Sequence, residues 1–316
     1  MTKERSTLEI VQHCNSVGDI DTLTQSEGLY RFVVNGRLAG LVSQADTQAL
    51  RQASNNQPQP VFNFDDETKQ ITFRDWCAGC TARTNALGKV LAEMRAAGTW
   101  ASLAKWRNEL FPVYGDPQNP TGISLFMERA ASYNFGIRSF AVFVNGIVTS
   151  GDYVRMWVAK RSLVKHTWPG YLDQLVAGGI GDGMGVWESV IKECKEESNI
   201  PEELARRAQP VGTVQYFSRS TLGLQPETLF IFDLELPADF VPTPNDGEVD
   251  SFYLWPLDQV LKKVQQGLFK PSCAMCAIDF MVRRGFITPE NEPRYLDIID
   301  NIHRSLPFPG PQSLTL

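Results

Sequence analysis

The feature that most constrains this chain is a glycine-rich segment followed at once by an acidic, amphipathic stretch. Five glycines fall between Gly178 and Gly185. From residue 186 to residue 198 the apolar side chains recur with helical spacing, which predicts a helix with one buried face. Asn199 can adopt the left-handed conformation that ends a helix, and Pro201 cannot continue one. The segment therefore predicts a flexible loop and then a helix with a defined end.

Three carboxylates give this predicted helix its chemistry. Glu193, Glu196 and Glu197 lie three or four residues apart, so they point to one flank of the helix. Like charges at this spacing repel each other, and a neighbouring cation would relieve that repulsion. Clustered carboxylates select hard divalent ions such as Mg²⁺, which also binds waters and substrate phosphates. We therefore expect a Mg²⁺ site, with Mn²⁺ as the alternative ion; an ordinary solvated Lys/Glu helix face is the competing interpretation.

Composition and charge limit the class of partner. The formal net charge is −6, from 30 basic and 36 acidic side chains. Such a chain has no global attraction for nucleic acid or for an anionic membrane, so neither is expected as a partner. No apolar run approaches the ~18 residues needed to span a bilayer, and the first residues resemble no targeting peptide. We expect a cytoplasmic protein with a small-molecule substrate.

Four of the six cysteines form two C-x-x-C pairs, Cys77/Cys80 and Cys273/Cys276. About 190 residues separate the pairs, whereas structural zinc ligands usually come close together in sequence. The second pair lies in an apolar stretch that reads as a buried helix. Buried thiols behave as small hydrophobic groups, so metal-free packing is the expected role.

The pattern of strands and helices predicts two domains. Asn35-Gly36 and Asn145-Gly146 each lie between β-rich runs, which predicts two tight hairpins. A turn-rich run at residues 114–122 marks the expected boundary, with an α+β extension over 1–120 and the main domain over 121–316. The expected fold class is α/β, because strands and helices alternate in the second half.

The individual elements follow from periodicity and turn residues. Strands are expected at 70–73, 155–159, 211–217, 229–236 and 252–255, and helices at 84–97, 100–110, 186–198, 257–266, 273–284 and 295–305.

The glycine–glutamate segment resembles the Nudix box, G-x5-E-x7-R-E-U-x-E-E-x-G-U, where U is aliphatic. Aligning the carboxylates places Gly178 at the first glycine, Glu193 at the R-E glutamate, and Glu196-Glu197 at the glutamate pair. The segment departs from the motif because Met184 stands at the first glutamate, Lys192 replaces arginine, Cys194 takes an aliphatic position and Asn199 replaces the later glycine. The resemblance implies a Nudix α/β/α sandwich with a mixed sheet and a metal held by Glu193, Glu196 and Glu197.

A narrower resemblance covers most of the chain. The segments 128–137, 160–162, 169–173, 176–180, 246–249 and 279–289 are similar to a Nudix subfamily. That subfamily includes the Nudix part of fungal thiamine pyrophosphokinase-fused proteins and plant and yeast stand-alone relatives, with a similar N-terminal extension. The resemblance implies Mg²⁺-dependent hydrolysis of thiamine diphosphate analogues, such as the oxo and oxy forms, to monophosphates.

Further site residues are expected around the box. Glu248 follows a turn-rich segment, and in Nudix folds a glutamate from this region often reaches the metal or serves as general base; Asp250 is a weaker competitor. Lys160 and Arg161 end a predicted strand and are expected to meet phosphate oxygens. Gly178 and Gly179 are expected to let the backbone approach the substrate.

Several alternatives stay open at this point. Another Nudix substrate, a nucleoside diphosphate or a nucleotide sugar, competes with the thiamine compounds. Met184 in place of glutamate also motivates a catalytically silent Nudix-fold binding protein. The N-terminal extension either shapes the substrate pocket or mediates a homodimer. Trp157 and Trp187 are expected in the core, and His166 in a loop.

Overall fold

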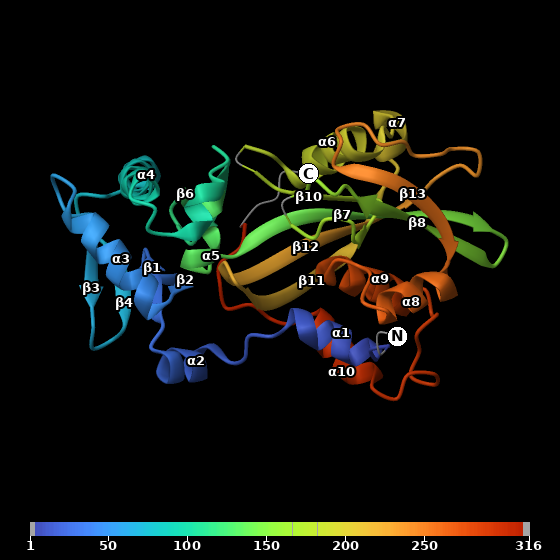
Figure 1. Ribbon diagram of the computed structural model, residues 1–316, viewed down its shortest axis with the longest axis horizontal. Helices are drawn as coiled ribbons and strands as arrows, with labels where there is room; N and C mark the ends of the chain where they lie inside the picture. The colour runs from blue at the N-terminus through green and yellow to red at the C-terminus, as the bar shows by residue number, and fades with distance from the viewer. Residues whose placement is uncertain (1–3, 166, 182, 312–316) are drawn as a thin grey trace.

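The computed structural model describes residues 4–165, 167–181 and 183–311, so the prediction for His166 lies outside the described residues. Two sheets dominate the molecule, a small one near the N-terminus and a large one in the second half (Figure 1). The expected α/β class, with a smaller α+β part in front, is confirmed.

The N-terminal elements build the small sheet, whose four strands run in the order β2-β1-β4-β3. Helices α3 and α4 pack on it through Leu50, Leu87 and Val90. The elements are α1 (Thr7–Cys14), α2 (Ile20–Glu27), β1 (Tyr30–Val34), β2 (Arg37–Val42), α3 (Gln44–Asn55), β3 (Phe62–Asp65), β4 (Gln70–Phe73), α4 (Cys80–Ala96), a 3-10 turn (Ala101–Lys105), β5 (Leu110–Tyr114), β6 (Ile123–Glu128), a second 3-10 turn (Arg129–Ala131) and α5 (Ser132–Phe135).

The second half builds the large sheet, whose main path runs β11-β12-β7-β8-β13. Strand β10 pairs with β7, and β9 pairs with β8. The elements are β7 (Ser139–Ser150), β8 (Tyr153–Arg161), β9 (Leu172–Asp173), β10 (Val176–Gly179), α6 (Val186–Ser198), α7 (Glu202–Ala205), β11 (Gln209–Ser220), β12 (Gly223–Glu235), β13 (Val249–Pro256), α8 (Leu257–Gln265), α9 (Pro271–Arg283) and α10 (Tyr295–Ile302). The sheet is mixed, because β12 runs parallel to β7 while β8 and β10 run antiparallel to it.

Helices cover both faces of the large sheet (Figure 1). Helix α6 lies on one face, where Val190 and Cys194 pack against Val142 and Val144 of β7. Helices α1, α8, α9 and α10 cover the other face. The α/β/α sandwich expected from the Nudix resemblance is therefore confirmed. In the part of the chain that the structure describes, no helix is both long and apolar enough to cross a membrane.

Packing links the two halves of the chain at two places. The core of the small sheet continues through β6 and α5 to Ile137. At the other end, Leu8 and Val11 of α1 pack in the core of the large sheet, and Arg5 N donates to Gln265 O at 2.9 Å. The domain division at residue 120 remains a proposal, and these contacts place β6 with the first core and α1 with the second.

The two Asn-Gly sequences have different outcomes. Asn35 and Gly36 have φ of 51° and 72° and connect β1 to β2, so the first predicted hairpin is confirmed. The second is wrong, because β7 continues through Asn145 and Gly146 and turns only at Gly151. A Cβ on Gly146 would lie 2.2 Å from Leu175 Cδ2, so this glycine serves close packing instead.

The other predicted elements are found with small shifts at their ends, with one exception. The helix expected at 100–110 is wrong: only the 3-10 turn Ala101–Lys105 forms there, and Leu110 already begins β5. Trp157 is buried as expected, and Trp187 packs edge-on against Phe232 at 5.1 Å. Cys77 is buried in the core of the small sheet, whereas Cys273 and Cys276 are buried in that of the large sheet.

Candidate active site

Helix α6 has the limits that the sequence predicts, Val186–Ser198. At its start, Gly185 N donates to the Glu188 carboxylate at 2.9 Å. At its end, Asn199 takes the left-handed conformation with φ 52°, and Ile200 N donates to Cys194 O at 3.0 Å. The helix is therefore fixed at both ends, which fixes the positions of the three glutamates on its second half.

Gly178 makes room for the carboxylate of Glu193. A Cβ at residue 178 would lie 2.2 Å from Glu193 Cδ and 2.6 Å from its Oε1. The glutamate thus lies directly against the backbone of β10. Burial raises the pKa of Glu193; Lys192 opposes this shift, and the charges of Glu196 and Glu248 add to it.

Glu197 is more deeply buried, with a relative exposure of 6%. Among the described residues its carboxylate accepts one hydrogen bond, from Ala177 N at 2.9 Å. Burial raises the pKa of Glu197 well above its usual value, the charge of Asp173 raises it further, and the bond from Ala177 opposes the shift. Two carboxylates with raised pKa values, Glu193 and Glu197, therefore lie along one edge of β10.

Lys192 currently neutralises part of this cluster. Its Nζ lies 3.0 Å from Glu193 Oε1 and 2.9 Å from Glu196 Oε2. Within the described ranges, no group of three or more His, Cys, Asp or Glu side chains is arranged to hold a metal ion. The carboxylates nevertheless suit a divalent cation, because they are hard oxygen donors whose ionised form is destabilised by burial and mutual repulsion. Binding would require Lys192 to release Glu193.

The structure brings Glu248 toward this cluster but gives its carboxylate a partner. Lys165 forms an ion pair with Glu248, and Ser162 N donates to the Glu248 backbone oxygen at 2.9 Å. Glu248 is close enough to Glu193 for its charge to raise the pKa of that residue. Its assignment as metal ligand or general base remains a prediction.

The two basic residues at the end of β8 have different surroundings. Lys160 forms an exposed ion pair with Asp250 at 3.1 Å. Arg161 is buried, is paired with Asp173, and donates from Nη2 to Thr167 O at 2.9 Å. Its donors hold the loop after β8, so the predicted phosphate contact of Arg161 would require these bonds to rearrange.

Asp173 and Lys165 are residues near the site that sequence reasoning missed. Burial alone would raise the pKa of Asp173, but Lys270, Arg161 and the Cys273 thiol hold it below its usual value. Asp173 is a single aspartate in the segment 169–173, and no periodic pattern in the sequence indicates that it is buried. Lys165 lies four residues after Arg161, which ends a predicted strand, and this was a weak signal.

The N-terminal elements reach the glycine loop. A Cβ on Gly179 would lie 3.6 Å from the ring of Phe111 on β5, and the Arg129 guanidinium lies 5.1 Å from the centre of that ring. Beside them, β5, β6 and the loop containing Met184 line a cavity of about 420 Å³. Met184 is thus in the cavity wall, at the position where the Nudix motif has a glutamate.

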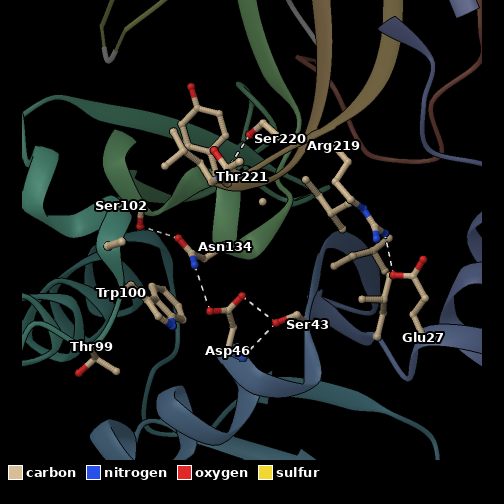
Figure 2. Close-up of a pocket in the computed structure, with 17 residues that line it drawn as sticks. Glu27, Ser43, Asp46, Thr99, Trp100, Ser102, Asn134, Arg219, Ser220 and Thr221 are labelled. Carbon is tan, nitrogen blue, oxygen red and sulfur yellow. Dashed lines mark hydrogen bonds and ion pairs between the residues drawn. The ribbon is translucent and has the colours of Figure 1, made fainter. Parts of the chain in front are cut away.

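Another cavity, of about 370 Å³, lies where the tip of the β11–β12 hairpin meets the N-terminal elements (Figure 2). Several of its polar groups are paired with each other: Ser102 donates to Asn134 at 2.6 Å, and Asn134 donates to Asp46 at 3.1 Å. None of the three site glutamates of α6 lines it. These two bonds lie within the N-terminal half of the chain, and the ion pair of Arg219 on β11 with Glu27 at 2.7 Å links the two halves beside the cavity.

Comparisons with known proteins divide the chain into two matched segments. A family model described as "NUDIX domain" matches residues 140–273, and one described as "Domain of unknown function (DUF4743)" matches residues 6–139. The chain is 38% identical to Nudix hydrolase 24, chloroplastic, of Arabidopsis thaliana, over 92% of this chain and 76% of that protein. It is 31% identical to the uncharacterized protein YJR142W of Saccharomyces cerevisiae, over 90% of this chain and 85% of that protein.

Among solved structures, DR0079 of Deinococcus radiodurans is similar, with a TM-score of 0.43 and 19% identity, over 54% of this chain and 98% of that chain. Nudix proteins act on small-molecule diphosphates and generally use divalent metals such as Mg²⁺. The relatives in Arabidopsis and yeast match this chain over most of their own length. The chain belongs to the Nudix hydrolase family.

Proposed function

We propose that this protein is a Mg²⁺-dependent pyrophosphohydrolase that cleaves a small organic diphosphate to its monophosphate, with Mn²⁺ as an alternative ion. The observation that carries the proposal is the pair Glu193 and Glu197 on α6. Both carboxylates lie against β10, Glu197 buried and Glu193 half-buried, and both have raised pKa values. A bound cation would stabilise their ionised forms.

The residues take separate roles in this proposal. Glu193, Glu196 and Glu197 hold the metal, which when bound neutralises charge on the diphosphate and polarises the phosphoryl group. Ala177 N fixes the orientation of Glu197. Gly178 gives the Glu193 carboxylate its place against β10, and a substrate contact of the Gly178 and Gly179 backbone remains a proposal. Glu248 is the candidate general base, since its charge acts on the same cluster.

Lys192 and Lys165 would act as counter-charges that keep the carboxylates apart before metal and substrate bind. Lys192 has ion pairs with Glu193 and Glu196, and Lys165 has one with Glu248. Lys160 lies at the surface beside Asp250, from which its ammonium group can turn toward a phosphate. Arg161 remains a candidate phosphate ligand only if its bond to Asp173 opens.

For the substrate, we propose thiamine diphosphate analogues such as the oxo and oxy forms, from the subfamily resemblance of the sequence. Nucleoside diphosphates and nucleotide sugars are the second candidates. A silent binding protein is the third, motivated by Met184. We further propose a cytoplasmic protein that forms a homodimer and has no nucleic acid or membrane partner.

The test is release of monophosphate with Mg²⁺ and with EDTA, over thiamine diphosphate, its oxo and oxy analogues, ADP, ADP-ribose and a nucleotide sugar. Metal-dependent turnover of the thiamine compounds supports the full proposal. Turnover confined to the nucleotides would retain the metal site and refute the thiamine assignment. Absence of turnover on every compound would favour the binding protein.

A further inference from the structure

The cavity beside the glycine loop has walls from both halves of the chain. Tyr114 of β5 and Phe126 of β6 come from the first half of the chain, and Phe140 of β7 and Phe230 of β12 come from the second. The rings of Tyr114 and Phe140 meet edge-on at 5.3 Å, and those of Phe140 and Phe230 lie nearly parallel at 6.3 Å. Its volume of about 420 Å³ is within the usual range for small-molecule sites.

The chemistry of the wall favours a flat ring without negative charge. Aromatic faces and edges bind flat rings and cations. Burial raises the pKa of Tyr114 to about 12, so its hydroxyl stays neutral. Among the described residues of the wall, Glu188 is the one charged side chain. An anionic group would therefore find no counter-charge in this wall.

Arg138 lies close to the cavity but is not part of that wall. Its guanidinium is 5.2 Å from the centre of the Phe140 ring. Its three nitrogens donate to Thr228 at 2.8 Å, to Phe308 O at 2.9 Å and to Gln215 at 2.9 Å. These bonds keep its donors away from a ligand in the cavity.

The cavity lies within reach of the glutamate site. Ile180 lines the cavity, and Gly178, two residues earlier, touches Glu193. Both residues are on the α6 face of β10, because Ile180 packs with that core and Gly178 is opposite Val142. Two residues of extended chain span about 7 Å. A substrate with a ring at one end and a diphosphate at the other can therefore occupy both places.

We propose that this cavity binds the organic end of the substrate, a flat heteroaromatic ring that is neutral or cationic. The inference rests on the proposed function for the position of the diphosphate. It also gives Met184 a role: where the motif has a carboxylate, the thioether supplies a polarizable surface that suits an aromatic ring. The N-terminal elements then take part directly in substrate selection, through Tyr114 and Phe126.

The test measures ring binding without hydrolysis, by isothermal titration calorimetry on the full chain in EDTA. The probes are thiamine, which is cationic, cytidine, which is neutral, and orotate, which is anionic. The variants are Phe230→Leu and Tyr114→Leu, which retain apolar volume but remove an aromatic face. The control is Phe252→Leu, a half-buried ring that packs on the same core but does not line the cavity. Circular dichroism verifies that each variant folds.

We expect thiamine or cytidine to bind and orotate not to bind. Phe230→Leu and Tyr114→Leu should each weaken binding about three- to tenfold, and Phe252→Leu should leave it unchanged. Ring binding of this kind supports the inference even if the protein hydrolyses no diphosphate, which would refute only the proposed function. Absence of binding by thiamine and cytidine, equal binding of orotate, or binding that both folded variants retain in full would overturn the inference.

Discussion

Replacing Gly178 by alanine should disable the site while leaving the fold nearly intact. The new Cβ would lie 2.2 Å from Glu193 Cδ, whereas carbon atoms in contact prefer about 3.5 Å or more. The carboxylate must therefore move by about 1.3 Å or more. A displacement of about 1 Å at a catalytic group can cost about 100-fold in rate, which corresponds to about 2.7 kcal/mol of activation free energy.

The matched control is Gly179→Ala, one residue along the same strand. There the Cβ would meet only the Phe111 ring, at 3.6 Å, which is ordinary contact. Neither glycine has positive φ among the described residues, so backbone strain does not separate the variants. The assay is kcat/KM for the best diphosphate substrate as a function of Mg²⁺ concentration. Equal activity of the two folded variants would refute the claim that Glu193 acts from its position against Gly178.

Three further predictions concern charge. Glu197→Gln should abolish turnover and, in EDTA, should make the protein more stable than wild type at pH 8 but not near pH 4. Because the pKa of Glu197 is raised in the folded protein, the wild type loses stability as pH rises above the usual pKa of a free glutamate, about 4.3. Urea denaturation at both pH values measures this, and a less stable variant at pH 8 would contradict it. Because Glu193 and Glu197 must both lose protons to bind metal, the Mg²⁺ concentration for half-maximal activity should rise as pH falls. A pH-independent value in metal titrations of activity would count against these ligands. Arg161→Met should cost about 3–5 kcal/mol of unfolding free energy, because it breaks the buried ion pair with Asp173. Lys160→Met should cost at most about 1 kcal/mol, since its pair with Asp250 is exposed. Equal losses in urea denaturation would show that burial does not decide the effect.

The glutamate helix could be predicted because its signals are local. Helical spacing, the αL residue Asn199 and Pro201 determine where α6 ends, and these lie within one short segment. The same holds for the Asn35-Gly36 turn, whose flanking strands pair directly with each other.

Long-range packing decided the features that the sequence could not reveal. Asn145-Gly146 has the same local preference as the first turn, but Asn145 Nδ2 donates to Asp233 at 2.9 Å and Gly146 lies against Leu175, so β7 continues through them. Leu110 leaves its expected helix because β5 pairs with β6.

The same limit applies to the site. The sequence shows that Glu193 and Glu197 share one flank of a helix. It does not show how far their carboxylates are removed from solvent, because that depends on β10 lying beside α6. From the sequence, Arg161 was expected to contact phosphate. Its buried ion pair could not be foreseen, because its partner Asp173 comes from the separate strand β9. An ion pair of this kind leaves no periodic pattern in the sequence.

The central claim is that the glutamates of α6 serve a metal-dependent cleavage of diphosphates. The most direct measurement is monophosphate release from one thiamine diphosphate analogue by wild-type protein and by Glu197→Gln, each with Mg²⁺ and with EDTA. The account predicts turnover only for wild-type protein with Mg²⁺. Equal turnover by the folded Glu197→Gln variant, or wild-type turnover that persists in EDTA, would contradict it.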